Sequence, residues 1–184
     1  GGGGGGGPPS AGAVGWGAKG VRGWGGVGAG RVWASTSSGV SVWDGAMWTT
    51  YTTADGLRDN DVRALWGDGA GWVWAGTYDP VAGVGGGVSV WDGTTWTIYT
   101  EADGLGDNDV RAFWRDGAGR MWAGTSRGVS VWDGATWTTY TEADGLGSDD
   151  IQALWGDGAG RVWAGTFYGG VSVWDGMKWT TYTE

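Results

Sequence analysis

The residues in this sequence that could most readily bind a ligand are aspartates, which gather in three short segments, "DGLRDND", "DGLGDND" and "DGLGSDD". Hard cations such as calcium bind clustered oxygen ligands from short loops. The segment with Asp103, Asp107 and Asp109 is therefore a candidate calcium site. The alternative is a solvated acidic rim, because all three segments lack the D-x-D-x-D-G spacing and the distal bidentate glutamate of a calcium loop. Beyond calcium we expect no cofactor.

The composition removes most routes to catalysis. The chain has no histidine and no cysteine, so the commonest general base, thiol nucleophiles, zinc-thiolate sites and disulfides are all excluded. A hydrolase built on two aspartates would need carboxylates about 5 to 10 Å apart in a cleft, one with a raised pKa. We therefore expect a protein that is not an enzyme.

The charge balance also limits the partners. The formal net charge is −9 and the isoelectric point is near 4.3, so a phosphate backbone or an anionic membrane surface would be repelled. No apolar run approaches the 18 residues or so of a membrane-spanning helix. These observations exclude nucleic acid and a membrane span, and leave a protein, a second copy of the chain or a glycan.

The elements that position the acidic segments belong to an internal repeat. The phrase W-A-G-T, or W-A-S-T in its first copy, occurs at Trp33, Trp74, Trp122 and Trp163, at intervals of 41, 48 and 41 residues. The long interval contains an insertion, "TYDPVAGVGGGVSV", where another unit has "TSRGVSV". The unit is therefore about 41 residues long and present four times.

One unit contains four strand signals. In the third unit these are Val110–Trp114, Arg120–Thr125, Val129–Asp133 and Trp137–Thr141, separated by turns rich in Asp and Gly. The turn aspartates, such as Asp116 in D-G-A-G and Asp133 in W-D-G, are expected to hydrogen-bond their own turn's backbone. Four short antiparallel strands in about 41 residues, repeated, predict an all-β fold: a β-propeller with four blades of four antiparallel strands.

These phrases resemble a known family, the two-component regulator propeller repeat. The match runs through Asp116, Gly119, Trp122, Gly124, Thr125, Asp133, Gly134, Trp137 and Tyr140, and the linking loop matches at Asp103, Gly104, Leu105, Asn108 and Val110. The resemblance covers roughly residues 21–184. It implies an extracytoplasmic (periplasmic or secreted) propeller of a bacterial signalling protein, in a family where many members respond to glycans. The chain departs from the family in having only four repeats and no following transmembrane, kinase or DNA-binding region.

The domain organisation follows from the repeat. Residues 1–20 are interpreted as a Gly/Pro-rich linker or a poorly identified segment, and residues 21–184 as the propeller domain. Three arrangements of the blades stay open. The chain closes as a four-bladed ring, two chains pair into an eight-bladed ring through exposed apolar faces, or the chain is part of a longer protein or complex.

Departures from the repeat mark candidate binding residues. Tyr78 and Asp79 lie in the insertion, which a propeller places on the same rim as the linking loops. Phe167 and Tyr168 occupy the equivalent loop of the last unit, and Trp72 stands where the other units have arginine. A tolerated loop insertion without function is the alternative.

The functional hypothesis from the sequence is a non-enzymatic binding or assembly module that presents rim loops to a protein partner within a larger extracytoplasmic complex. The alternative is a glycan-binding or glycan-sensing propeller. It predicts exposed aromatic side chains beside acids and amides on one rim.

Overall fold

The structure is a computed structural model that describes residues 22–28, 31–68 and 71–183, with side chains omitted for 23–28. The interpretation of residues 1–20 as a linker lies outside the described residues. Strands account for nearly all regular structure, and the described residues contain only three short 3₁₀ helices besides them. The all-β prediction is therefore confirmed.

Sixteen strands form four antiparallel sheets, each a simple meander of four strands that we call a blade. Blade 1 is β1 (Gly23–Gly28), β2 (Arg31–Thr36), β3 (Gly39–Trp43) and β4 (Trp48–Tyr51). Blade 2 is β5 (Asp61–Gly67), β6 (Val73–Asp79), β7 (Val84–Trp91) and β8 (Trp96–Tyr99). Blade 3 is β9 (Val110–Arg115), β10 (Met121–Thr125), β11 (Gly128–Trp132) and β12 (Trp137–Tyr140). Blade 4 is β13 (Ile151–Gly156), β14 (Val162–Thr166), β15 (Val171–Trp174) and β16 (Trp179–Tyr182).

The turn aspartates fold each blade locally. In the W-D-G turn of blade 3, the Oδ1 atom of Asp133 accepts hydrogen bonds from the backbone N–H groups of Ala135 at 2.8 Å and Thr136 at 2.9 Å. In the preceding D-G-A-G turn, Asp116 accepts bonds from the N–H groups of Ala118 and Arg120. The predicted role of these aspartates in their own turns is confirmed.

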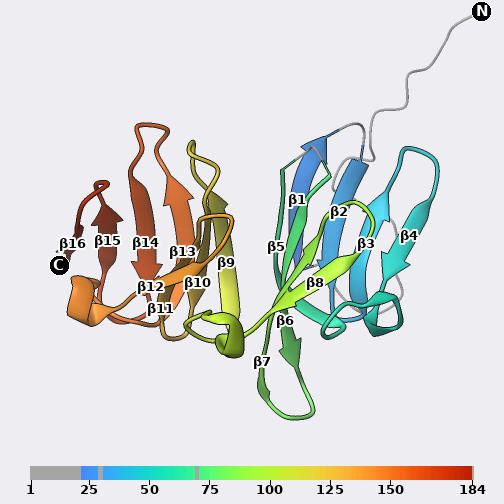
Figure 1. Cartoon of the computed structure of the whole chain (residues 1–184), viewed down its shortest axis with the longest axis horizontal. Coiled ribbons are helices and arrows are strands. Elements are labelled where there is room, and N and C mark those ends of the chain that lie inside the picture. Colours follow the sequence, from blue (N-terminus) through green and yellow to red (C-terminus); the bar gives the residue numbers. More distant parts are fainter. Residues whose placement is uncertain (1–21, 29–30, 69–70, 184) are drawn as a thin grey trace, which may run out of the picture.

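Consecutive blades are linked by a 3₁₀ helix and an aspartate-rich loop. The helices are η1 (Thr53–Asp55), η2 (Glu101–Asp103) and η3 (Glu142–Asp144). Because the strands of a meander alternate in direction, these links and the turns between second and third strands lie at one end of the sheets, which we call the lower rim (Figure 1). The D-G-A-G and W-D-G turns lie at the opposite end, the upper rim.

Each blade has two apolar faces, and both are used in packing. The leading face, which meets the following blade, carries Trp122, Val129, Val131 and Tyr140 in blade 3. The trailing face, which meets the preceding blade, carries Val162, Ala164, Trp174 and Trp179 in blade 4. These two faces form one continuous cluster, and Trp122 at its centre is fully buried. Of the recurring tryptophans, those at 33, 74, 91, 122 and 174 are buried, whereas those at 43, 132 and 163 are half-buried.

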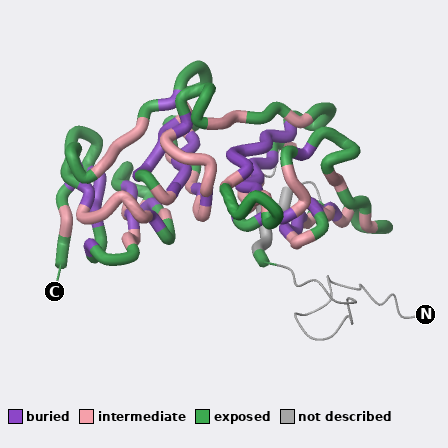
Figure 2. The backbone as a smooth tube through the Cα atoms, turned by 90° about the horizontal axis from the view of Figure 1, so that it is seen from below, coloured by how far each residue is buried: buried purple, intermediate pink, exposed green. Residues whose placement is uncertain are grey.

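The four blades form an open arc. The inner strands pack in chain order, β1 against β5, β5 against β9 and β9 against β13. Figures 1 and 2 both place blade 1 and blade 4 at opposite ends of the row, with buried segments in the middle of each blade. The closed four-bladed ring, one of the arrangements left open by the sequence, is therefore not what the structure shows.

Candidate functional site on the lower rim

The insertion of blade 2 forms a hairpin that projects from the lower rim beyond the other turns (Figure 1). Strands β6 and β7 pair down to Asp79 and Val84, and the turn between them is held by Asp79. The Oδ1 atom of Asp79 accepts hydrogen bonds from the N–H groups of Val81 at 2.8 Å and Ala82 at 2.9 Å. The tip is apolar: Val81 is 96% exposed, and Pro80, Ala82 and Val84 are exposed with it. The predicted placement of the insertion beside the linking loops is confirmed.

The base of the hairpin is fixed to the link before blade 3. The N–H group of Gly87 donates a hydrogen bond to the carbonyl oxygen of Asn108 at 2.9 Å. Gly85 approaches the same segment so closely that a Cβ atom there would lie 2.1 Å from the Asn108 carbonyl oxygen. Only glycine fits at that position, and its small size allows the backbones of the hairpin and the link to pack directly against each other.

Two clefts flank the hairpin. The cleft between blades 2 and 3 has a volume of about 490 Å³ and is lined by Arg63, Tyr78, Gly83, Val84, Gly85, Glu101, Asp107, Asn108, Asp109 and Arg127. The cleft between blades 1 and 2 has a volume of about 430 Å³ and is lined by Ser37, Asp59, Asn60, Asp61, Asp79, Pro80 and Val81. Tyr78 and Asp79 thus contribute to different clefts on the two sides of one hairpin.

The cleft between blades 2 and 3 carries both signs of charge. The guanidinium of Arg63 lies over the ring of Tyr78, 3.2 Å from its centroid, so this face of the tyrosine is covered. The Nε atom of Arg127 lies 3.2 Å from Oδ2 of Asp107. Glu101 and Asn108 are linked by a bond of 2.9 Å from the Glu101 N–H group to the Asn108 Oδ1 atom. Such a surface offers donors and acceptors at fixed positions to a polar ligand.

The three aspartates predicted as calcium ligands have separate protein partners. Asp103 accepts from the N–H and hydroxyl groups of Thr100 at 2.9 and 3.1 Å, which caps η2. Asp107 pairs with Arg127, and Asp109 accepts a 2.9 Å bond from Arg111. Within the part of the chain that the structure describes, no group of three or more acidic side chains is placed to hold a metal ion.

Arg111 joins blades 3 and 4 on this rim. Its guanidinium contacts both Asp109 of its own blade and Asp150 of the next. Burial by itself would lower the pKa of Arg111, but the hydrogen bonds and charges of the two carboxylates raise the pKa above its ordinary value. Arginine side chains therefore partly neutralise the charge of these acidic segments.

The remaining predicted residues lie elsewhere. Phe167 and Tyr168 are exposed on the lower rim of blade 4, with ring centroids 4.4 Å apart in an edge-to-face pair, and Tyr168 is 84% exposed. Trp72 is also exposed, but it precedes β6 on the upper rim, at the other end of the strand from Tyr78. Tyr78, Asp79, Phe167 and Tyr168 therefore lie on the same rim, and Trp72 lies on the opposite one.

Sequence reasoning missed four polar residues of the cleft between blades 2 and 3: Arg63, Glu101, Asn108 and Arg127. One signal was available, because Arg63 and Arg111 occupy the same position of the V-R-A phrase at the start of a blade. The sequence contained no signal for Arg127, since it is a single charged residue in a short turn. Its role depends on the proximity of Asp107.

Comparisons with known proteins identify the fold. No family model and no curated protein matches the chain. Among solved structures, the extracellular domain of the hybrid two-component system BT3049 from B. thetaiotaomicron superposes with a TM-score of 0.77 at 26% identity. The match covers 89% of this chain and 23% of that one. The extracellular domain of the one-component system BT4673 from the same organism gives 0.70 at 20% identity, over 89% and 24% of the two chains.

A surface component of the type-IX secretion system of Porphyromonas gingivalis, PorZ, shares the fold with a TM-score of 0.55 at 18% identity, over 84% of this chain and 24% of PorZ. The chain thus spans about a quarter of the length of these neighbours. No helix among the described residues has the length and apolarity needed to cross a membrane. The extracellular neighbours agree with the extracytoplasmic localisation expected from the sequence. They also confirm that the chain is a β-propeller resembling the two-component regulator propellers.

Proposed function

We propose that this chain is a non-enzymatic binding propeller that presents its lower rim to a protein partner in an extracytoplasmic complex. The observation that carries the proposal is the hairpin between β6 and β7. It is absent from the other blades, projects from the rim and exposes an apolar tip around Val81. Exposed apolar groups framed by polar residues are typical of the centre of a protein–protein interface.

The flanking clefts support the same function. The hairpin stands between two polar clefts, so a partner that covers the apolar tip also meets charged groups on both sides. The hairpin is rigid in its turn and at its base, through Asp79 and the contact of Gly85 with Asn108. A preformed protrusion loses little conformational freedom on binding, which favours affinity.

The carboxylates of the rim support a non-enzymatic role. Asp107 and Asp109 are paired with arginines, and no histidine or cysteine is present in the sequence to serve as a base or nucleophile. In the turns of the upper rim, the aspartate pKa values that are clearly shifted are lowered, as for Asp92 and Asp116, whereas a catalytic acid requires a raised pKa.

Site-specific photocrosslinking tests this function. A photoreactive residue replaces Val81 on the hairpin tip or, as the control, Met177, which is a similarly exposed apolar residue on the upper rim. In cells that express the chain we expect a discrete crosslinked protein from position 81 and none of the same mass from position 177. Equal adducts from both positions, or none from position 81, would contradict a protein partner at this rim.

The second candidate is glycan binding, supported by the exposed Phe167–Tyr168 pair on the same rim. Exposed aromatic rings beside the acids of the neighbouring loop offer a flat apolar surface with polar groups at its edge. A glycan array measured with the wild type and with Tyr168→Ala tests it. Retention that is lost in the variant supports a glycan, and unchanged or absent retention contradicts it.

A further inference from the structure

Arg63 differs from the arginines at the equivalent position of the repeat. At two junctions between blades, the arginine at the start of an inner strand pairs with the aspartate that precedes the next inner strand. These pairs are Arg22 with Asp61, at 2.6 Å, and Arg111 with Asp150. At the junction between blades 2 and 3, the carboxylate oxygen nearest to Arg63 among the described residues is Oδ2 of Asp61, 4.0 Å away. This distance is too long for a hydrogen bond.

The hairpin of blade 2 accounts for the difference. Asp109, the equivalent partner at this junction, is held at 2.9 Å by Arg111 of its own blade. The guanidinium of Arg63 lies instead over the ring of Tyr78. Stacking engages the flat face of a guanidinium and leaves the N–H groups at its edge available. The side chain of Arg63 is 37% exposed, so these donors are accessible to a ligand.

A second arginine faces the same cleft. Arg127 contacts Asp107 through its Nε atom, and its side chain is 70% exposed, so its terminal nitrogens are accessible. The acids of the cleft already accept hydrogen bonds from within the chain. Asp107 accepts one of 2.7 Å from the N–H group of Asp109, and Asp109 accepts one of 2.9 Å from Arg111. Glu101 accepts a longer one, 3.4 Å, from the backbone of the link. The groups available to a ligand are therefore mainly donors, which suit a carboxylate.

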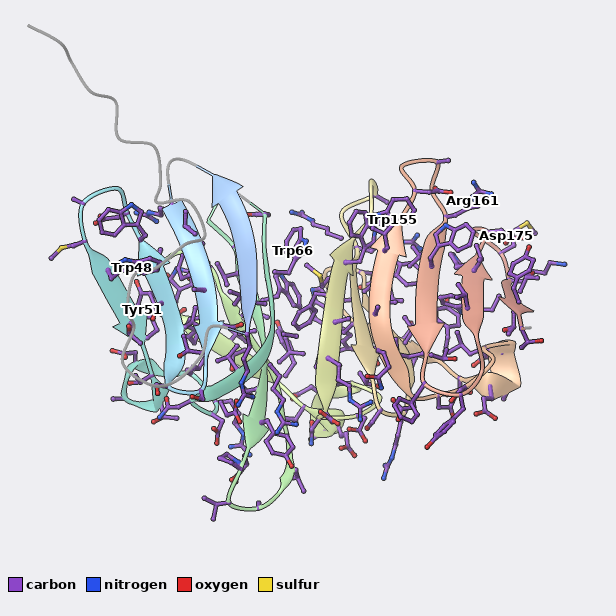
Figure 3. The ribbon with its side chains drawn as sticks, turned by 180° about the vertical axis from the view of Figure 1, so that it is seen from behind. Trp48, Tyr51, Trp66, Trp155, Arg161 and Asp175 are labelled. Carbon is purple, nitrogen blue, oxygen red and sulfur yellow. The ribbon has the colours of Figure 1, made fainter. Side chains whose placement is uncertain are left out.

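The packed core between blades 2 and 3 lies above this cleft. Trp74 and Phe113 pack edge to face in that core, with ring centroids 6.4 Å apart, and Figure 3 shows Trp66 in the same junction. On the side of the hairpin, Val84 lines the cleft and is 55% exposed. A group that enters the cleft from the lower rim therefore meets an apolar side chain beside the two arginines.

We propose that Arg63 and Arg127 bind a carboxylate of the protein partner, from an Asp or Glu side chain, in the cleft between blades 2 and 3. An arginine binds a carboxylate through two parallel hydrogen bonds, and the stack on Tyr78 orients Arg63 before the partner arrives. The neighbouring Val84 favours a partner segment in which an apolar residue lies next to the acid. The source of the carboxylate rests on the proposed function, whereas the arginine site can be tested without a partner.

The photocrosslink from position 81 tests the site with the partner present. Arg63→Gln removes the charge but breaks no hydrogen bond and no close ion pair within the described residues, so the thermal midpoint should stay nearly unchanged. We expect the yield of the crosslinked protein to fall about tenfold, because a charged hydrogen bond is lost. The control, Arg58→Gln, makes the same charge change at an exposed residue of the linking loop that lines neither cleft, and should leave the yield unchanged.

The crosslink also separates this inference from the proposed function. A crosslinked protein whose yield is the same with Arg63→Gln as with the wild type would overturn the carboxylate site and leave the protein partner in place. The absence of any crosslinked protein from the wild type would contradict the protein partner itself.

Nuclear magnetic resonance of the purified chain tests the site without the partner. The probes are N-acetylglutamate amide and the neutral N-acetylglutamine amide. The readout is the Nε–H signals of Arg63 and Arg127, which Arg63→Lys and Arg127→Lys assign. We expect the glutamate probe to shift both signals with a dissociation constant of about 1 to 10 mM, and the glutamine probe to shift neither. No shift with glutamate, or equal shifts with both probes, would overturn the site. Tighter binding of glucuronate, titrated in parallel, would overturn the assignment of the carboxylate to a protein.

Discussion

The four equivalent valines of the third strands allow interblade packing to be measured at one repeat position. Val40, Val88 and Val129 are covered by the following blade, and Val171 is not. Replacing a valine by alanine removes two methyl-sized groups, each worth about 0.8 kcal/mol when buried, and adds a cavity cost. We therefore expect Val129→Ala to lower the free energy of unfolding by about 2 to 3 kcal/mol. Val171→Ala should lower it by about 1 kcal/mol or less.

Urea unfolding, followed by tryptophan fluorescence at low protein concentration, measures this difference. The urea midpoint should fall for Val129→Ala with no change in the slope. In thermal unfolding the same loss corresponds to about 4 to 12 °C for a chain of this length. A matched control is the pair Val131→Ala and Val173→Ala. Both valines are 6% exposed, so the two substitutions should lower the free energy of unfolding by similar amounts.

Two outcomes would refute the reasoning. If Val129→Ala and Val171→Ala are equally destabilising in dilute solution, the following blade is not what buries Val129. If Val131→Ala and Val173→Ala differ as strongly as the first pair, local differences between blades outweigh burial.

Three further predictions concern the turns. Gly128→Ala should destabilise the fold strongly, because φ at Gly128 is +116° and a Cβ atom there would lie 2.2 Å from the Tyr140 carbonyl oxygen. The control is Gly134→Ala, where φ is +106° but the space around the position is open. In thermal unfolding this control should lose only about 1 to 2 kcal/mol of stability. Asp116→Asn should cost about 1 to 3 kcal/mol in urea unfolding, because its carboxylate accepts bonds from an arginine and a buried indole N–H group. Hydrogen bonds from the following turn lower the pKa of Asp92 from 3.8 to about 2. The ionised carboxylate therefore stabilises the fold above pH 3.8, and this stabilisation is lost as the pH falls towards 2. The wild type should unfold at a higher urea concentration than Asp92→Asn, and this difference should shrink across that pH range.

The sequence by itself determined the blade and its local parts. The spacing of Trp33, Trp74, Trp122 and Trp163 predicts the number of units, and the strands predicted for the third unit agree with β9 to β12 within about one residue. Turn aspartates such as Asp133 were interpreted correctly. These features depend on hydrogen bonds and side-chain alternation between residues close together in the chain, so they are visible in the sequence.

The tertiary structure decided which side chains meet. Asp103, Asp107 and Asp109 are close in sequence, yet each carboxylate has a different partner: Thr100 for Asp103, and Arg127 and Arg111 for the other two. Arg63 covers the face of Tyr78 from a neighbouring strand. A list of acids and aromatics contains no information on side-chain direction, and direction depends on packing between strands and blades.

The openness of the ring was likewise decided only in three dimensions. All four units carry the same apolar residues, so the sequence is equally compatible with a closed ring of four blades and with half of a larger one. What distinguishes them is the angle between successive blades, and this angle is set by large side chains such as Trp74 and Trp122 packed between the sheets. In the structure that angle leaves Val171 and Tyr182 exposed at one end of the arc, because the packing between neighbouring blades does not bring blade 4 back to blade 1.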